Sequence, residues 1–278
     1  MVEEQGEAAA IERSLQKTYC KRIWNPFTGA VKRYRLLEEG DCVAVCVSGG
    51  KDSFLAAKLL RMLQRHSDFP FELRYLCMDP GYSPENRQHI EAMAARLGIP
   101  LEFFASDIFR VVENAGGSPC YLCARMRRGY LYKEAQARGC NKIALGHHFS
   151  DVVETTLMGM LYGAQIQTMP PKLKSRNYPG MELIRPLYCV HEDDILAWAR
   201  RNGLEFIRCA CRFTESNAQS GGGIGASKRQ EVKALIRELK RAHPDVEKCI
   251  FQSMHNVRLD TAIGYTHKGV EHSFLEGY

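Results

Sequence analysis

The stretch from residue 43 to residue 63 constrains the fold more than any other part of the chain. Val43–Val47 is apolar and rich in valine, which is typical of a parallel strand covered on both faces. The loop Ser48-Gly49-Gly50-Lys51-Asp52-Ser53 follows, and residues 54–63 form an Ala/Leu/Lys-rich helical run. The glycines permit a sharp turn that exposes amide groups at the positive end of this helix, beside a lysine. The unit predicts a site for a phosphate-bearing ligand.

The loop differs from the two common nucleotide-binding motifs. Its lysine does not end a GxxxxGK[ST] run, and the loop has no GxGxxG pattern. It resembles the loop of the pyrophosphate-loop ATPases, which split ATP to AMP and pyrophosphate while they adenylate a substrate carbonyl. The alternative is a glycine-rich turn between a strand and a helix.

Composition limits the classes of protein to consider. A chain of 278 residues can form one large α/β domain with an appendage. The net charge of +6 permits a nucleic-acid partner without requiring one. The eleven cysteines are odd in number and partly lie in apolar runs, so we expect Cys42, Cys46 and Cys77 to pack in the core rather than form disulfides. We expect a cytoplasmic protein, because neither a signal peptide nor a membrane span is recognisable.

Strand-like and helix-like segments alternate along most of the chain. Strands are expected at 43–47, 71–78, 101–105, 142–145 and 182–184, with a further short one at Leu204–Ile207. Helices are expected at 54–63, 84–97, 121–138, 151–162, 192–202, 227–242 and 246–254. This alternation predicts a doubly wound (HUP/Rossmann-like) parallel sheet of about five strands with helices on both faces, plus small N-terminal and C-terminal appendages. The ligand should bind at the carboxyl ends of the strands.

Two cysteine pairs accompany the phosphate-binding loop. Cys120 and Cys123 are three residues apart at the start of a predicted helix, where they share a face and the helix dipole favours thiolates. Arg127 follows one turn later, with Arg125 and Arg128 beside it, so anions could be held near the thiols. The second pair is Cys209 and Cys211. The residues alone leave both a four-thiolate zinc site and an iron–sulfur cluster open.

The chain from about residue 38 to residue 257 resembles the TtcA family of tRNA 2-thiocytidine synthetases. The resemblance rests on six motifs: SGGKDS from Ser48, CxLCxRxRRGxLY from Cys120, KIALGHHxxD from Lys142, MPPKL from Met169, IRPL from Ile184 and MHNV from Met254. Such enzymes adenylate O2 of a cytidine in the tRNA anticodon loop and replace that oxygen with sulfur at a [4Fe-4S] cluster. The expected product is 2-thiocytidine.

This resemblance implies the roles of particular residues. Lys51, Asp52 and Asp151 would be catalytic, with Asp52 and Asp151 positioning Mg²⁺. Cys120, Cys123 and Cys211 would hold the cluster and leave one iron free for sulfide. The ATP site would comprise Ser48, Gly49, Gly50, Lys51, Asp52, Ser53, Met78, Asp79, Gly146 and His147. The expected partners are tRNA and a sulfur donor such as a cysteine desulfurase system, and a homodimer is compatible with the resemblance.

The chain departs from the family pattern at two places. The later cysteine pair is CxC instead of CxxC, which leaves the choice between Cys209 and Cys211 open, although the family's ligand is the second cysteine. The family motif GHHxDD has Ser150 in place of its first acid. The two histidines, His147 and His148, are expected to cap hydrogen bonds at a strand end rather than to act directly in catalysis.

Basic residues suggest where RNA could bind. Lys21, Arg22, Lys172 and Lys174 are candidates for contacts with the tRNA backbone, and Tyr19 and Trp24 are candidates for base stacking. We divide the chain into a basic N-terminal arm (1–40), a pyrophosphate-loop ATPase domain with the cluster site (41–215), and a Gly-rich linker with C-terminal helices (216–278). Two other functions stay open: an adenylating ligase similar to lysidine synthetase, and a noncatalytic RNA-binding protein with zinc or an iron–sulfur cluster.

Overall fold

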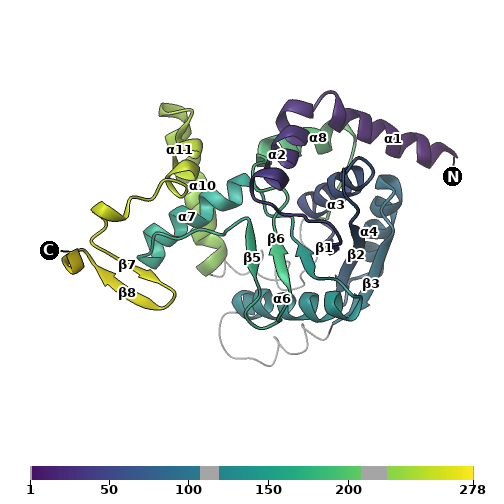
Figure 1. Ribbon diagram of the computed structural model, residues 1–278. Helices are drawn as coiled ribbons and strands as arrows, with labels where there is room; N and C mark the ends of the chain where they lie inside the picture. Colours follow the sequence, from purple (N-terminus) through teal and green to yellow (C-terminus); the bar gives the residue numbers. More distant parts are fainter. Residues whose placement is uncertain (1, 107–118, 208–223, 278) are drawn as a thin grey trace.

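The computed structural model describes residues 2–106, 119–207 and 224–277, which build a sheet between layers of helices (Figure 1). The sheet has six strands in the order β3-β2-β1-β4-β6-β5. Their bounds are β1 Cys42–Cys46, β2 Glu72–Asp79, β3 Leu101–Ala105, β4 Lys142–Ala144, β5 Lys172–Lys174 and β6 Glu182–Ile184. Only β5 runs antiparallel to its neighbour within this described sheet. The order changes direction at β1 and β4, where a doubly wound sheet binds its ligand.

Helices cover both faces of the sheet. The main core buries apolar residues of α1 (Val2–Gln16), α3 (Lys51–Gln64), α4 (Pro84–Leu97) and α8 (Glu192–Arg201) against one face. On the other face, α6 (Pro119–Ala137) packs Tyr132 and Ala135 against Leu76 and Ile143 of the strands. The predicted doubly wound architecture is therefore confirmed.

Helix α7 and the C-terminal helices form a smaller cluster beside the sheet. Apolar residues of α7 (Phe149–Gly163), α10 (Ile224–Ala242) and α11 (Val246–Ser253) pack together around Phe149, Val232 and Phe251. The chain continues through η2 (Leu259–Thr261) into a hairpin of β7 (Gly264–His267) and β8 (Val270–Ser273), and then into η3 (Phe274–Gly277). This hairpin was not predicted from the sequence. In the described ranges, no helix is long and apolar enough to cross a membrane.

The N-terminal segment is part of the main core. It comprises α1, a π-helical turn η1 (Cys20–Trp24) and α2 (Asn25–Arg33). Its apolar residues recur every four positions, at Ile11, Leu15, Tyr19, Ile23 and Phe27, and all five are buried in the main core. Since Tyr19 is only 4% exposed, the prediction that its ring stacks on an RNA base is wrong.

The structure corrects two further sequence predictions. The sheet has six strands instead of about five, because the three residues of β5 pair with β6 at the edge. The strand expected at Leu204–Ile207 is absent from the described structure: Leu204 is buried without a ladder partner, and Phe206 packs its ring on Phe54. Hydrophobic burial alone accounts for that apolar run.

All three cysteines that were predicted to pack in the core do so. Cys46 and Cys77 are buried, as expected. Cys42 is half-buried, and its Sγ lies 3.3 Å from Sγ of Cys140 without a disulfide between them.

Candidate active site

The loop after β1 is closed by the hydroxyl of Ser53. This hydroxyl donates to the carbonyl of Gly50 (2.8 Å) and accepts from the backbone N–H of Ser48 (3.1 Å). Gly50 is the N-cap of α3 and provides no side-chain cap, so the first amides of the helix are open to an anion. Gly49 has φ +86°, and an added Cβ would clash with the side chain of Ile207. The loop therefore requires glycine at this position.

A second loop, after β4, packs directly on the first. A Cβ added to Gly146 would lie 2.8 Å from the backbone nitrogen of Ser53. Further on, His148 caps α7: its Nδ1 accepts from the N–H of Asp151 (3.3 Å), and the Asp151 carboxylate accepts from the N–H of His148 (3.1 Å). Because Nδ1 is an acceptor, the proton of a neutral His148 is on Nε2, which lies 3.8 Å from Oδ1 of Asp52. His148 thus hydrogen-bonds to Asp151 and lies near Asp52, and its predicted capping role is confirmed.

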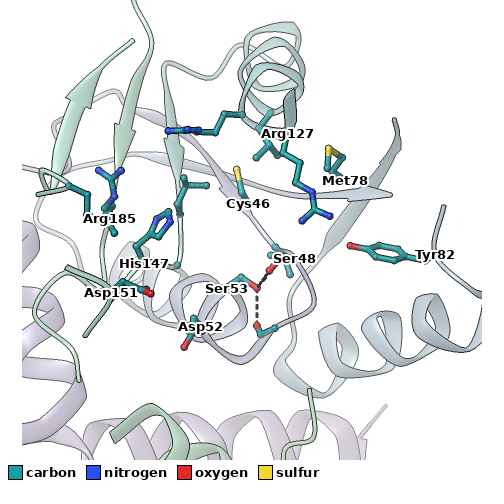
Figure 2. Close-up of a pocket in the computed structure, with 17 residues that line it drawn as sticks. Cys46, Ser48, Asp52, Ser53, Met78, Tyr82, Arg127, His147, Asp151 and Arg185 are labelled. Carbon is teal, nitrogen blue, oxygen red and sulfur yellow. Dashed lines mark hydrogen bonds between the residues drawn. The ribbon is translucent and has the colours of Figure 1, made fainter. Parts of the chain in front are cut away.

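The two loops form one wall of a cavity of about 560 Å³ (Figure 2). Asp151, which was predicted to be catalytic, lines it, and so do most residues predicted for the ATP site: Ser48, Gly50, Asp52, Ser53, Met78, Gly146 and His147. Gly49, Lys51 and Asp79 do not. Asp52 Oδ1 is buried without a hydrogen-bond partner among the described residues. A free carboxylate oxygen facing a cavity is a suitable ligand for Mg²⁺.

Lys51 is bound by protein carboxylates. Its ammonium Nζ lies 3.0 Å from Oδ2 of Asp52 and 3.1 Å from Oε1 of Glu192, at the start of α8. Burial by itself would lower the pKa of Lys51, but the charges of the two carboxylates raise it above the ordinary value. Glu192 also contacts Lys233 of α10 at 3.1 Å. The phosphate loop is therefore tied to two later helices through Glu192.

Asp79 has a structural role in this arrangement. One of its oxygens accepts from the backbone N–H groups of Gly81 and Tyr82, each at 2.8 Å, and the other pairs with Arg87 at 3.0 Å. These bonds fix the turn after β2. Tyr82, in that turn, lines the cavity, although the sequence analysis did not single it out.

Three arginines from outside the two loops also line the cavity. Arg127 and Arg128 come from α6, and Arg185 follows β6. Figure 2 shows Arg127 reaching toward the loop that carries Ser48. Nε of Arg127 and Nε of Arg185 are buried without a hydrogen-bond partner in the described structure. We call these three residues the arginine wall.

The arginine wall makes the cavity favourable for anions. Burial and the neighbouring Arg128 charge lower the pKa of Arg185 to about 10, so it is still cationic at neutral pH. Burial, followed by the charge of Arg185, lowers the pKa of His147 to about 4. His147 is thus neutral at pH 7, and the positive charge belongs to the arginines. The sequence analysis predicted anion binding for Arg127 and Arg128 but missed Arg185, whose signal was the IRPL motif.

The described structure contains two of the three predicted cluster ligands. Cys120 and Cys123 lie in α6, and Arg127 lies one turn further along the same helix. Cys211 lies outside the described residues, as does its neighbour Cys209. Within the described ranges, no three His, Cys, Asp or Glu side chains gather as a metal site.

The predicted tRNA contacts differ in their surroundings. Lys172 pairs with Glu38 (3.3 Å) and Glu182 (3.0 Å), and Arg22 pairs with Asp194 (3.3 Å). Lys21 and Lys174 are exposed. The structure places Lys21 and Arg22 on η1 and Lys172 and Lys174 on β5, so these residues belong to two separate elements.

The fold and the cavity define a nucleotide-binding protein of the PP-loop class, and comparisons with known proteins agree. A family model of the PP-loop domain matches residues 12–219. A tRNA-cytidine(32) 2-sulfurtransferase of Alkalilimnicola ehrlichii is 37% identical over 248 residues, covering 87% of this chain and 75% of the relative. That of Geobacter metallireducens is 35% identical and covers 87% of this chain and 92% of the relative. The chain belongs to the family of the tRNA-cytidine(32) 2-sulfurtransferases (TtcA).

A solved structure supports the fold. The U34-tRNA thiolase NcsA from Methanococcus maripaludis, determined with its [4Fe-4S] cluster, superposes with a TM-score of 0.65 at 21% identity. The match covers 84% of this chain and 77% of the thiolase.

Proposed function

We propose that this chain is an ATP-dependent tRNA-cytidine 2-sulfurtransferase that adenylates O2 of an anticodon-loop cytidine and replaces it with sulfur. The observation that carries the proposal is the cavity between the phosphate loop and the arginine wall. It combines free helix amides, two carboxylates and arginines on the helix that also contains Cys120 and Cys123. Family membership supplies the reaction and the substrate.

The geometry suits adenylation. The amides at the start of α3 would hold the pyrophosphate portion of ATP, and Asp52 and Asp151 would hold Mg²⁺. Arg127, Arg128 and Arg185 would neutralise the charge that develops as the cytidine oxygen attacks the α-phosphate. Pyrophosphate leaves, and the adenylated O2 becomes a good leaving group, so sulfide can attack C2 and release AMP.

Lys51 has a predicted catalytic role that requires a movement. Its ammonium is bound to Asp52 and Glu192 and does not line the cavity. It can serve the phosphates only if they replace Glu192 as its partner. We therefore propose that the arginine wall provides most of the positive charge and that Lys51 contributes less.

We also propose that Cys120, Cys123 and Cys211 hold a [4Fe-4S] cluster. The donor set fits, since thiolates three residues apart on one helix are suitable ligands for such a cluster, and the next turn of α6 reaches the cavity through Arg127. With three protein ligands, a cluster retains one iron that can carry sulfide. The substrate would be tRNA, and the sulfur donor would be a cysteine desulfurase system. A homodimer is compatible with this function.

The function is tested by preparing the protein without oxygen and measuring two products with tRNA and ATP. We expect AMP formation that depends on tRNA, and 2-thiocytidine in the digested tRNA by mass spectrometry. AMP formation without sulfur insertion, in a preparation free of iron, would favour the adenylating-ligase alternative. RNA binding without ATP turnover would favour the noncatalytic one.

Single serine variants test the ligand set. Cys120→Ser, Cys123→Ser and Cys211→Ser should each lose the broad iron–sulfur absorption and all thiolation, whereas Cys209→Ser should retain most of both. If Cys209→Ser loses the iron–sulfur absorption and thiolation while Cys211→Ser retains both, the third ligand is Cys209. A requirement for all four cysteines would remove the free iron and contradict the proposal.

A further inference from the structure

A second cavity adjoins the first and shares one residue with it. It has a volume of about 830 Å³ and lies between α6 and the turn that joins β5 to β6. Arg128 lines both cavities. Sites for small ligands typically have volumes of about 300–1,000 Å³, so this cavity has room for part of a nucleic-acid strand. The shared arginine places the second cavity next to the proposed ATP cavity.

The lining of the second cavity is positively charged. It contains Arg128, Lys174 and Arg176, and among the described residues that line it none is acidic. All three cations are exposed, and none of them pairs with a carboxylate in the described parts of the chain. Lys172, two residues before Lys174, is bound by Glu38 and Glu182. The charge near this turn is thus neutralised at Lys172 and free at Lys174 and Arg176.

An aromatic side chain is fixed in the same wall. The ring of Tyr178 stacks on Tyr132, with centroids 5.0 Å apart and planes at 17°. Its hydroxyl donates to the carbonyl of Gly129 at 3.0 Å. The ring is therefore held at both its face and its hydroxyl while it is only half-buried. Aromatic rings beside free cations are the usual surface for single-stranded RNA, whose bases stack while its phosphates pair with Lys and Arg.

We propose that this second cavity binds the single-stranded RNA next to the target cytidine. Lys174 and Arg176 contact phosphates, Tyr178 contacts a neighbouring base, and Arg128 marks the passage through which the target base enters the ATP cavity. The inference rests on the proposed function, because it assumes an RNA substrate. A target inside a duplex could not reach the ATP cavity, since its base would be stacked and paired.

The test measures binding of an anticodon stem-loop RNA with a loop cytidine to the full chain over a series of salt concentrations. The variant is Lys174→Ala combined with Arg176→Ala, and the matched control is Lys133→Ala, an exposed lysine of α6 that lines neither cavity. Each phosphate contact with a single strand contributes roughly 0.7 to the slope of log K against log salt. The double variant should therefore lower the slope by about 1.4, and the control should leave it unchanged. An unchanged slope in the double variant, or an equal loss in the control, would overturn the proposal.

A second pair of variants tests the aromatic contact. Tyr178→Leu removes the ring and should weaken RNA binding roughly 5- to 150-fold, the range for loss of one base stack. Tyr178→Phe retains the ring and should restore most of the affinity. Equal affinities of the Leu variant and the wild type would contradict the role of the ring. Thermal unfolding of each variant shows whether it is folded.

The outcomes separate this inference from the proposed function. Binding of an ATP analogue without RNA should be the same in wild type and in the Lys174/Arg176 double variant, because neither residue lines the first cavity. If the wild type thiolates tRNA but the variants bind RNA as tightly as the wild type does, only this inference is overturned. The predicted salt dependence without thiolation would leave the inference standing and contradict the proposed function. A wild-type protein that binds no RNA would contradict both.

Discussion

The loop side and the arginine wall of the proposed ATP cavity present their charges differently. On the loop side, the signature lysine Lys51 is already neutralised by Asp52 and Glu192. In the arginine wall, Arg127 and Arg185 each have a buried Nε without a hydrogen-bond partner in the described structure. A buried donor without a partner is costly, so these groups are suited to a ligand rather than to the fold. We therefore propose that the recognisable motif provides the shape of the phosphate site and that less conspicuous residues provide its free charge.

The largest effect that would test this comparison concerns the carboxylates of the loop side. Asp52→Asn or Asp151→Asn should lower the rate of tRNA-dependent AMP formation roughly 10²–10³-fold, as expected when a group that stabilises transition-state charge is removed. Single-turnover assays at saturating Mg²⁺ measure this rate. Rates within a few-fold of wild type would mean that the two carboxylates do not hold the metal.

The next effect concerns the tie between Lys51 and Glu192. Burial would raise the pKa of Glu192, but the charge of Lys51 and the other contacts lower it to about 2. An acid whose folded-state pKa is depressed stabilises the fold above its unfolded pKa of about 4.5 and loses that contribution as the pH falls toward 2. Glu192→Gln should therefore cost up to about 3 kcal/mol of unfolding free energy at pH 7.

Urea unfolding at pH 7, 4.5 and 3 measures this difference. It should be largest at pH 7 and shrink below pH 4.5 as the wild-type carboxylate is protonated in the unfolded state. A difference that is constant over this range would show that Glu192 acts through packing and not through its charge.

The smallest predicted effect concerns the shape of the loop side. Gly146→Ala places a Cβ 2.8 Å from the nitrogen of Ser53, so it should destabilise the protein by about 1–3 kcal/mol, as overpacking does, and also raise the KM for ATP. Gly29→Ala in α2, where an added Cβ meets nothing within 4 Å, serves as the control and should be neutral or slightly stabilising. Equal melting temperatures for the two variants would contradict the close contact between the two loops.

Local signals explain which elements the sequence predicted well. Helix α4 has the predicted bounds because Ser83 caps its first turn and Gly98 ends it in a left-handed conformation. Strand β3 also has the predicted bounds, because it is a short apolar run between turn residues. Strand β5 was missed because Lys172–Lys174 has no such run and forms only by pairing with β6. Pairing partners distant in sequence are not visible in local patterns.

The same limit applies to the site. The residues of the two loops could be predicted because each follows a strand at the carboxyl edge of the sheet. The environment of Lys51 could not be predicted from the sequence, because it depends on Glu192, which is 141 residues further along the chain. Arg185 reaches the cavity only because β6 pairs with β4, and that register is a property of the folded sheet.

Binding of a nonhydrolysable ATP analogue with Mg²⁺ to Arg127→Met and Lys51→Met tests the central claim most directly. Isothermal titration calorimetry without tRNA gives the two dissociation constants. If the arginine wall provides the free charge, Arg127→Met should lose a charged hydrogen bond of about 1.5–3 kcal/mol and weaken binding roughly 10- to 100-fold. Lys51→Met should weaken it by a smaller factor, because Lys51 must first leave Glu192. A larger loss in Lys51→Met than in Arg127→Met would contradict the account and return the main phosphate contact to the loop lysine.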